Sequence, residues 1–105
     1  MPYVSLLMIT AHNKPAREVA QIWIDRRCIE EAAESIPGFL RGEVLVNDES
    51  GGKVCVLCVW NARSDYEAWQ KSPLRDKQGA DIAPLVKADV TSICFDQMHE
   101  VERAA

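Results

Sequence analysis

The sequence predicts an α+β fold in which strands and helices follow the order βαββαβ and build one antiparallel sheet. Segments whose apolar residues have the spacing of a strand and segments whose apolar residues have the spacing of a helix follow one another along the chain. The expected strands at residues 3–9 and 54–60 are apolar on both faces, whereas a half-exposed strand alternates apolar with polar side chains. A chain of 105 residues can cover only one face of such a sheet with helices, so the other face is expected to meet a second copy.

The first half of the chain contains two strands around one long helix. The first strand covers residues 2–12, and the turn after it ends at Pro15, which suits the first turn of a helix. Apolar residues recur at helical spacing over residues 15–35, so one continuous helix is expected there. Pro37-Gly38 ends this helix, and residues 39–46 form the second strand.

The second half of the chain completes the predicted sheet. Its expected elements are, in order, a strand at 53–61, a helix at 64–71, a short helical segment at 74–82, a strand at 90–98 and a frayed tail at 99–105. We therefore expect a single ferredoxin-like domain over residues 1–105. Two such sheets packed face to face would make a homodimer, a dimeric α/β barrel.

Charge and hydropathy exclude several classes of function. The formal net charge is −4 and no basic stripe occurs, so neither nucleic acid nor an anionic membrane surface is expected as a partner. No apolar stretch approaches the ~20 residues that a membrane span needs. The uncharged first 13 residues lack a basic leading region, so we interpret them as a strand rather than a signal peptide and expect a cytoplasmic protein.

The cysteines do not predict a metal site. Cys55 and Cys58 lie three residues apart in an expected strand, so their side chains point to opposite faces and cannot bind one ion. Together with Cys28 and Cys94 they are interpreted as small buried apolar residues of a reducing compartment. Zinc, calcium and P-loop spacings are also missing from the sequence, so no metal ligands are predicted.

A ligand pocket is expected between the helices and the sheet. The strand at 54–60 places Val56, Cys58 and Trp60 on one face, which would form the floor of such a pocket. As a group, the larger aromatic residues could form its walls and accept a flat aromatic ligand, although for any single one of them an ordinary core position is the favoured interpretation. These residues are Trp23, Trp60, Tyr66 and Trp69.

Arg26 lies within the apolar stripe of the first helix, between Ile22 and Ile29. A guanidinium at such a position is not expected to be buried without a partner. One interpretation is an ion pair with a carboxylate such as Glu43. The other is that Arg26 is a cation of the pocket and binds the carboxylate or phenolate of a ligand.

Three short stretches stand at the turns of this predicted fold. They are Ile36-Pro37-Gly38-Phe39, Val59-Trp60-Asn61-Ala62-Arg63-Ser64-Asp65-Tyr66 and Ala68-Trp69-Gln70-Lys71-Ser72-Pro73. In order and spacing they resemble the signature of the antibiotic biosynthesis monooxygenase (ABM) family, and the resemblance extends over residues 3–95. It implies a dimeric α+β barrel.

The best-known enzymes of that family oxidise polycyclic phenols or anthrones to quinones with dioxygen, without metal or flavin. Ground-state dioxygen is a triplet and reacts slowly with closed-shell molecules. Such an enzyme must therefore deprotonate its substrate, stabilise the anion and exclude water. The resemblance thus implies a cofactor-independent monooxygenase whose partners are a small aromatic or phenolic molecule and dioxygen.

Residue by residue, the resemblance covers Trp60, which matches the family tryptophan, and Tyr66, which matches a tyrosine of the quinone-forming members. With Arg26, these are the expected catalytic residues. Quinone-forming members also carry an asparagine four residues before the tryptophan, and Val56 stands there instead. The expected substrate-binding residues are Trp23, Val56, Cys58 and Trp69.

Two alternative functions stay open. Val56 in place of the asparagine favours a non-catalytic dimeric barrel that binds a small ligand. The haem-degrading branch of the family resembles the chain at Trp69, but its haem-ligating histidine has Gly79 as counterpart. The strand-one asparagine of that branch is also missing, since Leu7 and Met8 occupy the region. A haem-degrading monooxygenase is therefore the less favoured alternative.

Overall fold

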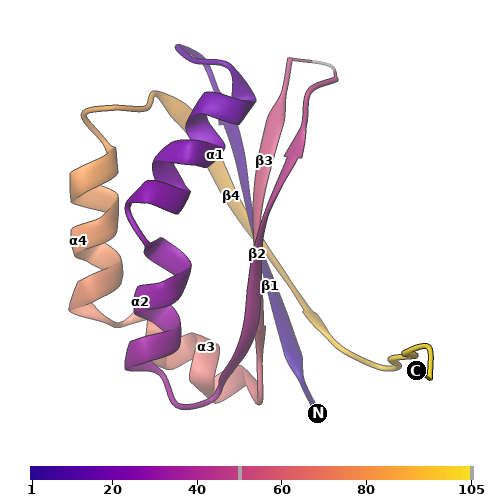
Figure 1. The fold of residues 1–105 in the computed structure, drawn as a ribbon. Coiled ribbons are helices and arrows are strands. Elements are labelled where there is room, and N and C mark those ends of the chain that lie inside the picture. The colour runs from indigo at the N-terminus through magenta and orange to yellow at the C-terminus, as the bar shows by residue number, and fades with distance from the viewer. Residues whose placement is uncertain (50, 105) are drawn as a thin grey trace.

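The computed structural model describes residues 1–49 and 51–104, which form one sheet covered by helices on one face (Figure 1). The strands are β1 (Tyr3–Ala11), β2 (Phe39–Asn47), β3 (Lys53–Trp60) and β4 (Ala88–Asp96). The helices are α1 (Ala16–Asp25), α2 (Cys28–Ser35), α3 (Arg63–Gln70) and α4 (Pro73–Ile82). All strand pairs are antiparallel, in the order β2-β3-β1-β4. This confirms the predicted ferredoxin-like α+β fold.

The helices cover the sheet unevenly. α1 and α2 pack on β2 and β3, whereas the contacts of α4 are mainly with α2. In Figure 1, α4 accordingly lies farther from the sheet than α1 and α2. Within the part of the chain that the structure describes, no helix is long and apolar enough to cross a bilayer.

The single helix predicted over residues 15–35 is wrong, because α1 ends at Asp25 and α2 begins at Cys28. Arg27 between them has a left-handed backbone, with φ of 58°. The amides of Arg26 and Arg27 close the end of α1 on the carbonyls of Ile22 and Ile24. The apolar stripe continues across this break, so periodicity could not reveal it.

The last strand also differs from its predicted bounds of 90–98. β4 begins at Ala88, which pairs with Ala11, and it ends at Asp96, which pairs with Tyr3. Pairing with β1 therefore determines the extent of β4. The apolar run that extends to Met98 does not.

One face of β3 forms the centre of the core. Val54, Val56, Cys58 and Trp60 all point toward the helices and are at most 8% exposed. The Trp60 side chain is fully buried, and its indole Nε1 donates to the Ser5 Oγ at 2.9 Å. Since an unpaired N–H is costly in an apolar core, this bond matters for the stability of the sheet.

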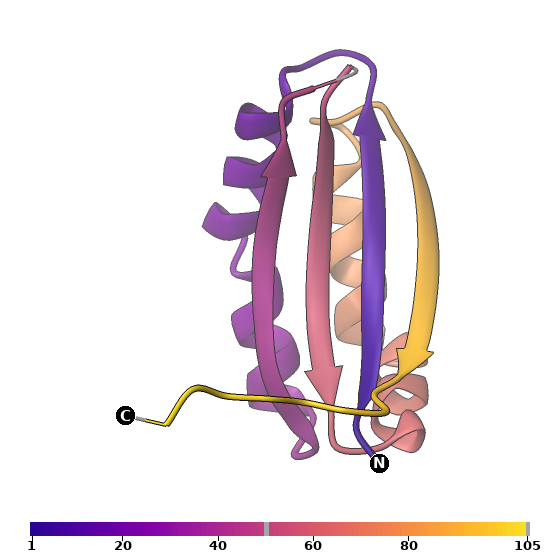
Figure 2. The same cartoon turned by 90° about the vertical axis from the view of Figure 1, so that its right-hand side faces the viewer.

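The other face of the sheet carries no helix. The register places Leu6 opposite both Leu57 and Ile93, so apolar side chains continue across β3, β1 and β4. Figure 2 shows this face, with the C-terminal segment running across one end of the strands. Residues 97–104 form neither helix nor strand, and residues 97–100 line a shallow hollow over Val4 and Val59.

The Ser5–Trp60 bond can be tested by a double-mutant cycle. Ser5→Ala removes the acceptor of a buried donor, so we expect the free energy of unfolding to fall by about 1–3 kcal/mol. In Ser5→Ala/Trp60→Phe no donor is left unpaired, so the combined loss should be smaller than the sum of the single losses. Urea denaturation followed by circular dichroism measures all four proteins. Strictly additive losses would contradict this bond.

Candidate functional site

A cavity of about 510 Å³ lies between the sheet and the helices. Strands β1, β3 and β4 form one side, and all four helices contribute residues to its wall. Val90 and Ser92 of the edge strand β4 line the cavity and are also exposed, so the cavity reaches solvent along this edge. The lining is mostly apolar, as expected for a site that takes a small organic molecule.

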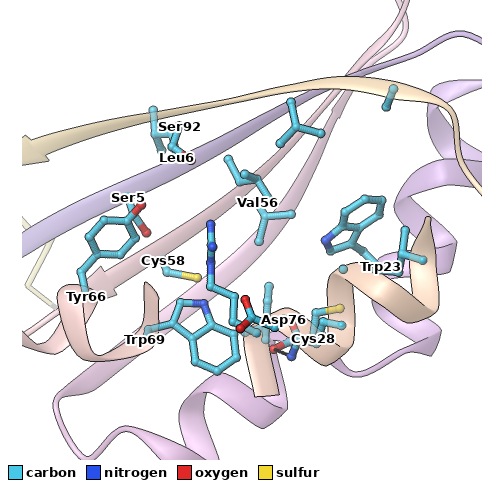
Figure 3. A pocket seen from close by; sticks show the side chains of 18 of the residues that line it. Ser5, Leu6, Trp23, Cys28, Val56, Cys58, Tyr66, Trp69, Asp76 and Ser92 are labelled. Atoms are coloured by element: carbon cyan, nitrogen blue, oxygen red, sulfur yellow. Dashed lines mark hydrogen bonds between the residues drawn. The ribbon is translucent and has the colours of Figure 1, made fainter. Parts of the chain in front are cut away.

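Six of the seven residues that the sequence analysis selected line this cavity. They are Trp23, Val56, Cys58, Trp60, Tyr66 and Trp69. Figure 3 shows Tyr66, Trp69 and Trp23 around the space above Val56 and Cys58. The structure thus brings together the expected floor and the expected walls.

Two local patterns position these side chains. Alternation along β3 turns Val56, Cys58 and Trp60 toward the helices. The helical spacing of α3 places Tyr66 and Trp69, three residues apart, on its buried side.

The turn from β3 to α3 is fixed by contacts between two of the sequence stretches singled out above. The backbone N–H of Asn61 donates to the Gly38 carbonyl at 2.7 Å. The Asp65 carboxylate accepts from the Ala62 N–H at 3.0 Å and so caps α3. A Cβ at Gly38 would overlap the Asp65 carboxylate, so glycine is needed there. These contacts set the position of Tyr66 on the following turn.

Trp60 forms a rigid part of the wall. Its ring packs edge-on against Phe39, with centroids 5.4 Å apart, and lies 6.0 Å from the Tyr66 ring. Because its N–H is already bonded to Ser5, Trp60 has no hydrogen bond to offer a ligand. Trp60 therefore contributes to the shape of the cavity and not to hydrogen bonding with a ligand.

Tyr66 brings a hydroxyl to the cavity. Gln70 Nε2 donates to the Tyr66 Oη at 3.2 Å, which leaves the phenol proton available for another acceptor. Burial, with a smaller effect of Cys94, raises the pKa of Tyr66, while the positive charge of Arg75 acts in the opposite direction. The phenol is therefore neutral at physiological pH and can donate a hydrogen bond.

The cavity thiols are unreactive. Burial raises the pKa of Cys28 to about 11 and that of Cys58 to about 12. Both are protonated at neutral pH, and a thiol is a poor nucleophile and metal ligand compared with a thiolate. Among residues 1–49 and 51–104, no group of three or more His, Cys, Asp or Glu side chains is placed to hold a metal ion.

Arg26 is the selected residue that does not line the cavity. Its Nη1 donates to Glu31 Oε1 at 2.8 Å, and its Nε donates to Asp81 Oδ2 at 3.0 Å. Of the two interpretations of Arg26, the ion pair therefore agrees with its contacts. The expected partner Glu43 is wrong, because Glu43 pairs with Arg41. Arg26 connects the α1–α2 junction to α4.

The polar wall of the cavity comes from α4, which the sequence analysis did not select. Arg75, Asp76 and Gln78 all line it. Gln78 is occupied, since its Nε2 donates to the Cys28 carbonyl at 3.1 Å and to Glu31 Oε1 at 3.0 Å. Positions 75, 78 and 82 share one face of α4 by helical spacing, but the helix has too weak an amphipathic pattern for the sequence to identify this face as the inward one.

Relatives with curated names match part of the chain. The "Heme-degrading monooxygenase" proteins of Bacillus thuringiensis (strain Al Hakam) and Bacillus cereus (strain AH187) are each 33% identical over 70 residues. The alignment spans 65% of this chain and 65% of each relative's own length.

Solved structures match over nearly the whole chain. SnoaB of Streptomyces nogalater, described as a cofactor-independent oxygenase, has a TM-score of 0.74 at 13% identity, covering 97% of this chain and 98% of its own. Rv0793 of Mycobacterium tuberculosis has a TM-score of 0.73 at 12% identity, with coverages of 97% and 100%. A dimeric protein with a ferredoxin-like fold from Bacteroides fragilis NCTC 9343 has a TM-score of 0.69 at 11% identity, with coverages of 91% and 96%. At these identities the likeness shows the fold.

The family model described as "Antibiotic biosynthesis monooxygenase" matches residues 3–77. The match runs from β1 into α4 and includes the contacts that hold Tyr66 in place. The chain therefore belongs to the antibiotic biosynthesis monooxygenase family.

Proposed function

We propose that the protein is a cofactor-independent monooxygenase that acts on a small aromatic or phenolic compound inside this cavity. The observation that carries the proposal is the composition of the cavity wall. All three tryptophans of the chain line it, together with the neutral phenol of Tyr66 and the cationic Arg75. A flat aromatic molecule suits such a slot.

The proposed reaction converts an activated CH₂ group of the substrate to a carbonyl. Loss of a proton gives an electron-rich anion, which transfers one electron to dioxygen. The substrate radical and superoxide then combine into a peroxide with a new C–O bond. Elimination of water breaks the O–O bond, so that one oxygen atom stays in the product and the other leaves in water. The substrate itself supplies all four electrons.

The wall residues fit separate parts of this reaction. Tyr66 donates a hydrogen bond to the substrate oxygen on which negative charge develops. The charge of Arg75 favours the anionic over the neutral substrate. Asp76 lines the cavity and is exposed, so it can accept the proton and return it to solvent. Trp60 and Trp69 exclude water from the reacting atoms.

Tyr66→Phe tests the role of the phenol in oxygen uptake with an anthrone substrate. We expect kcat/KM to fall about a hundredfold, because one donor to the developing anion is lost. Tyr3→Phe is the matched control, since the Tyr3 ring is tilted against that of Tyr66 with centroids 5.8 Å apart but does not line the cavity. Turnover by the wild type no faster than the no-protein rate in air would contradict the proposal. Saturable thermal stabilisation without product would instead favour a binding protein.

We further propose that the protein acts as a homodimer through the helix-free face of the sheet. Ile93 and Phe95 on this face are 47% and 53% exposed, and they are continuous with Leu6 and Leu57. A contiguous apolar surface of this kind is unusual on a monomer. The dimeric Bacteroides fragilis protein of the same fold also supports the proposal.

Leu57→Glu places a charge at the middle of this face, so we expect it to dissociate the dimer at micromolar concentration. Sedimentation equilibrium should give twice 11.8 kDa for the wild type and 11.8 kDa for the variant. Leu85→Glu is the control for the added charge, because Leu85 is 50% exposed and lies in the loop before β4. A monomeric wild type would rule out the proposed assembly.

Haem degradation is the second candidate, and the curated relatives favour it. Gly79, the counterpart of the haem-ligating histidine, lines the cavity, and a side chain there would enter open space. The space for such a ligand is therefore present while the ligand itself is missing. This favours the cofactor-independent reaction over haem degradation.

Gly79→His tests this comparison directly. We expect haemin to produce a saturable Soret shift with Gly79→His and none with the wild type, because only the variant offers an imidazole to the iron. Titration in the visible spectrum measures both proteins, and Lys53→His at an exposed position of β3 is the control for nonspecific binding. Saturable haemin binding by the wild type, followed by ring opening with a reductant, would favour haem degradation instead.

A further inference from the structure

Arg75 differs from most other arginines of the chain in its surroundings. Ion pairs are formed by Arg17, Arg26, Arg27, Arg41 and Arg63, each with a nearby carboxylate. Arg75 is partly buried, and within the described ranges 1–49 and 51–104 its guanidinium has neither an ion pair nor a side-chain hydrogen bond. It lines the cavity. A cation in an apolar cavity without a protein partner is ready to bind an anion.

The surroundings of Arg75 define the kind of anion. A guanidinium presents two parallel N–H donors, which match the two oxygens of a carboxylate. Asp76, the neighbour of Arg75 in the chain, lines the same cavity, so a second negative charge on the anchoring group itself would be repelled. A monoanionic carboxylate therefore fits better than a dianionic phosphate.

The rest of the cavity defines the body of the ligand. Trp23, Val56 and Trp69 offer apolar surface on several sides of the cavity, and Figure 3 shows Trp23 and Trp69 on opposite sides of it with Val56 between them. The volume of about 510 Å³ is that of a site for a molecule with several rings. The Tyr66 hydroxyl accepts a hydrogen bond from Gln70 and still has a proton that it can donate to a second polar group of the ligand.

We propose that the substrate is an aromatic carboxylic acid, whose carboxylate binds Arg75 while its ring system lies between the tryptophans. The inference rests on the proposed function, since it assigns the substrate class of the same cavity. The carboxylate anchors the molecule, and the oxygen at the reacting centre faces Tyr66. Arg75 then determines which aromatic compounds bind, and it does so through a permanent charge of the substrate.

Two probes that differ only in charge test the inference. They are anthracene-2-carboxylate and anthracene-2-carboxamide, titrated by calorimetry at neutral pH into the full chain. We expect the wild type to bind the acid about tenfold more tightly than the amide, because the charged bidentate pair is available only to the acid. Arg75→Gln should remove this preference and leave the affinity for the amide unchanged. Arg63→Gln removes the same charge from an exposed ion pair and should keep the preference.

The outcomes separate this inference from the proposed function. Equal binding of acid and amide to the wild type, or a preference that survives Arg75→Gln in a variant with unchanged circular dichroism, overturns the carboxylate assignment alone. Such a result would leave the proposed function, oxidation of an aromatic compound in this cavity, unaffected. Failure of both probes to bind the wild type overturns the assignment together with the proposed aromatic site. A preference lost in Arg75→Gln and retained in Arg63→Gln supports the inference.

Discussion

The attachment of α4 to α2 is the interaction on which the site depends. Glu31 of α2 accepts from both Arg26 and Gln78, and Arg26 also donates to Asp81 of α4. Arg26 and Glu31 are only 20% and 22% exposed, so water screens this pair less than the surface pairs. The hydrogen bond from Gln78, followed by Arg26, lowers the pKa of Glu31, so this carboxylate is charged at neutral pH. These bonds hold α4 on α2 and away from β1 and β4, and the cavity occupies the space that results.

The sheet connects this site to its other face through a single strand. Val56 and Cys58 of β3 form the cavity floor, while Leu57 between them points to the face without helices. A change in the position of β3 therefore moves both surfaces together. In the proposed homodimer the partner would fix β3 from the outside, just as the Ser5–Trp60 bond fixes it from the inside. Dimer assembly and the shape of the cavity would then both depend on the position of β3.

The sequence was sufficient to predict the sheet and most of the cavity wall, because both depend on strong local signals. Apolar runs of strand length indicated the sheet, and alternation along β3 placed Val56, Cys58 and Trp60 on the side that the helices cover. The pocket cation could not be predicted in the same way. Arg26 lies in an apolar stripe, but the left-handed backbone of Arg27 breaks the helix there. Arg26 then binds Glu31 of α2 and does not line the cavity. Arg75 lies in a helix of weak amphipathic pattern, and only the attachment of α4 to α2 shows which of its faces is inward.

The residues that hold the turn from β3 to α3 and those that would select a substrate occupy different parts of the structure. Gly38, Asn61 and Asp65 hold the turn from β3 to α3 through backbone and capping contacts, and none of them lines the cavity. They position α3 and lie inside the range that the family model matches, but they do not specify a reaction. Inside the cavity, by contrast, lie Val56, Gly79 and Arg75, and Arg75 has no ion pair within the described ranges 1–49 and 51–104. The match over residues 3–77 shows the family, whereas the chemistry of the protein must follow from the cavity residues, because only they can contact a substrate.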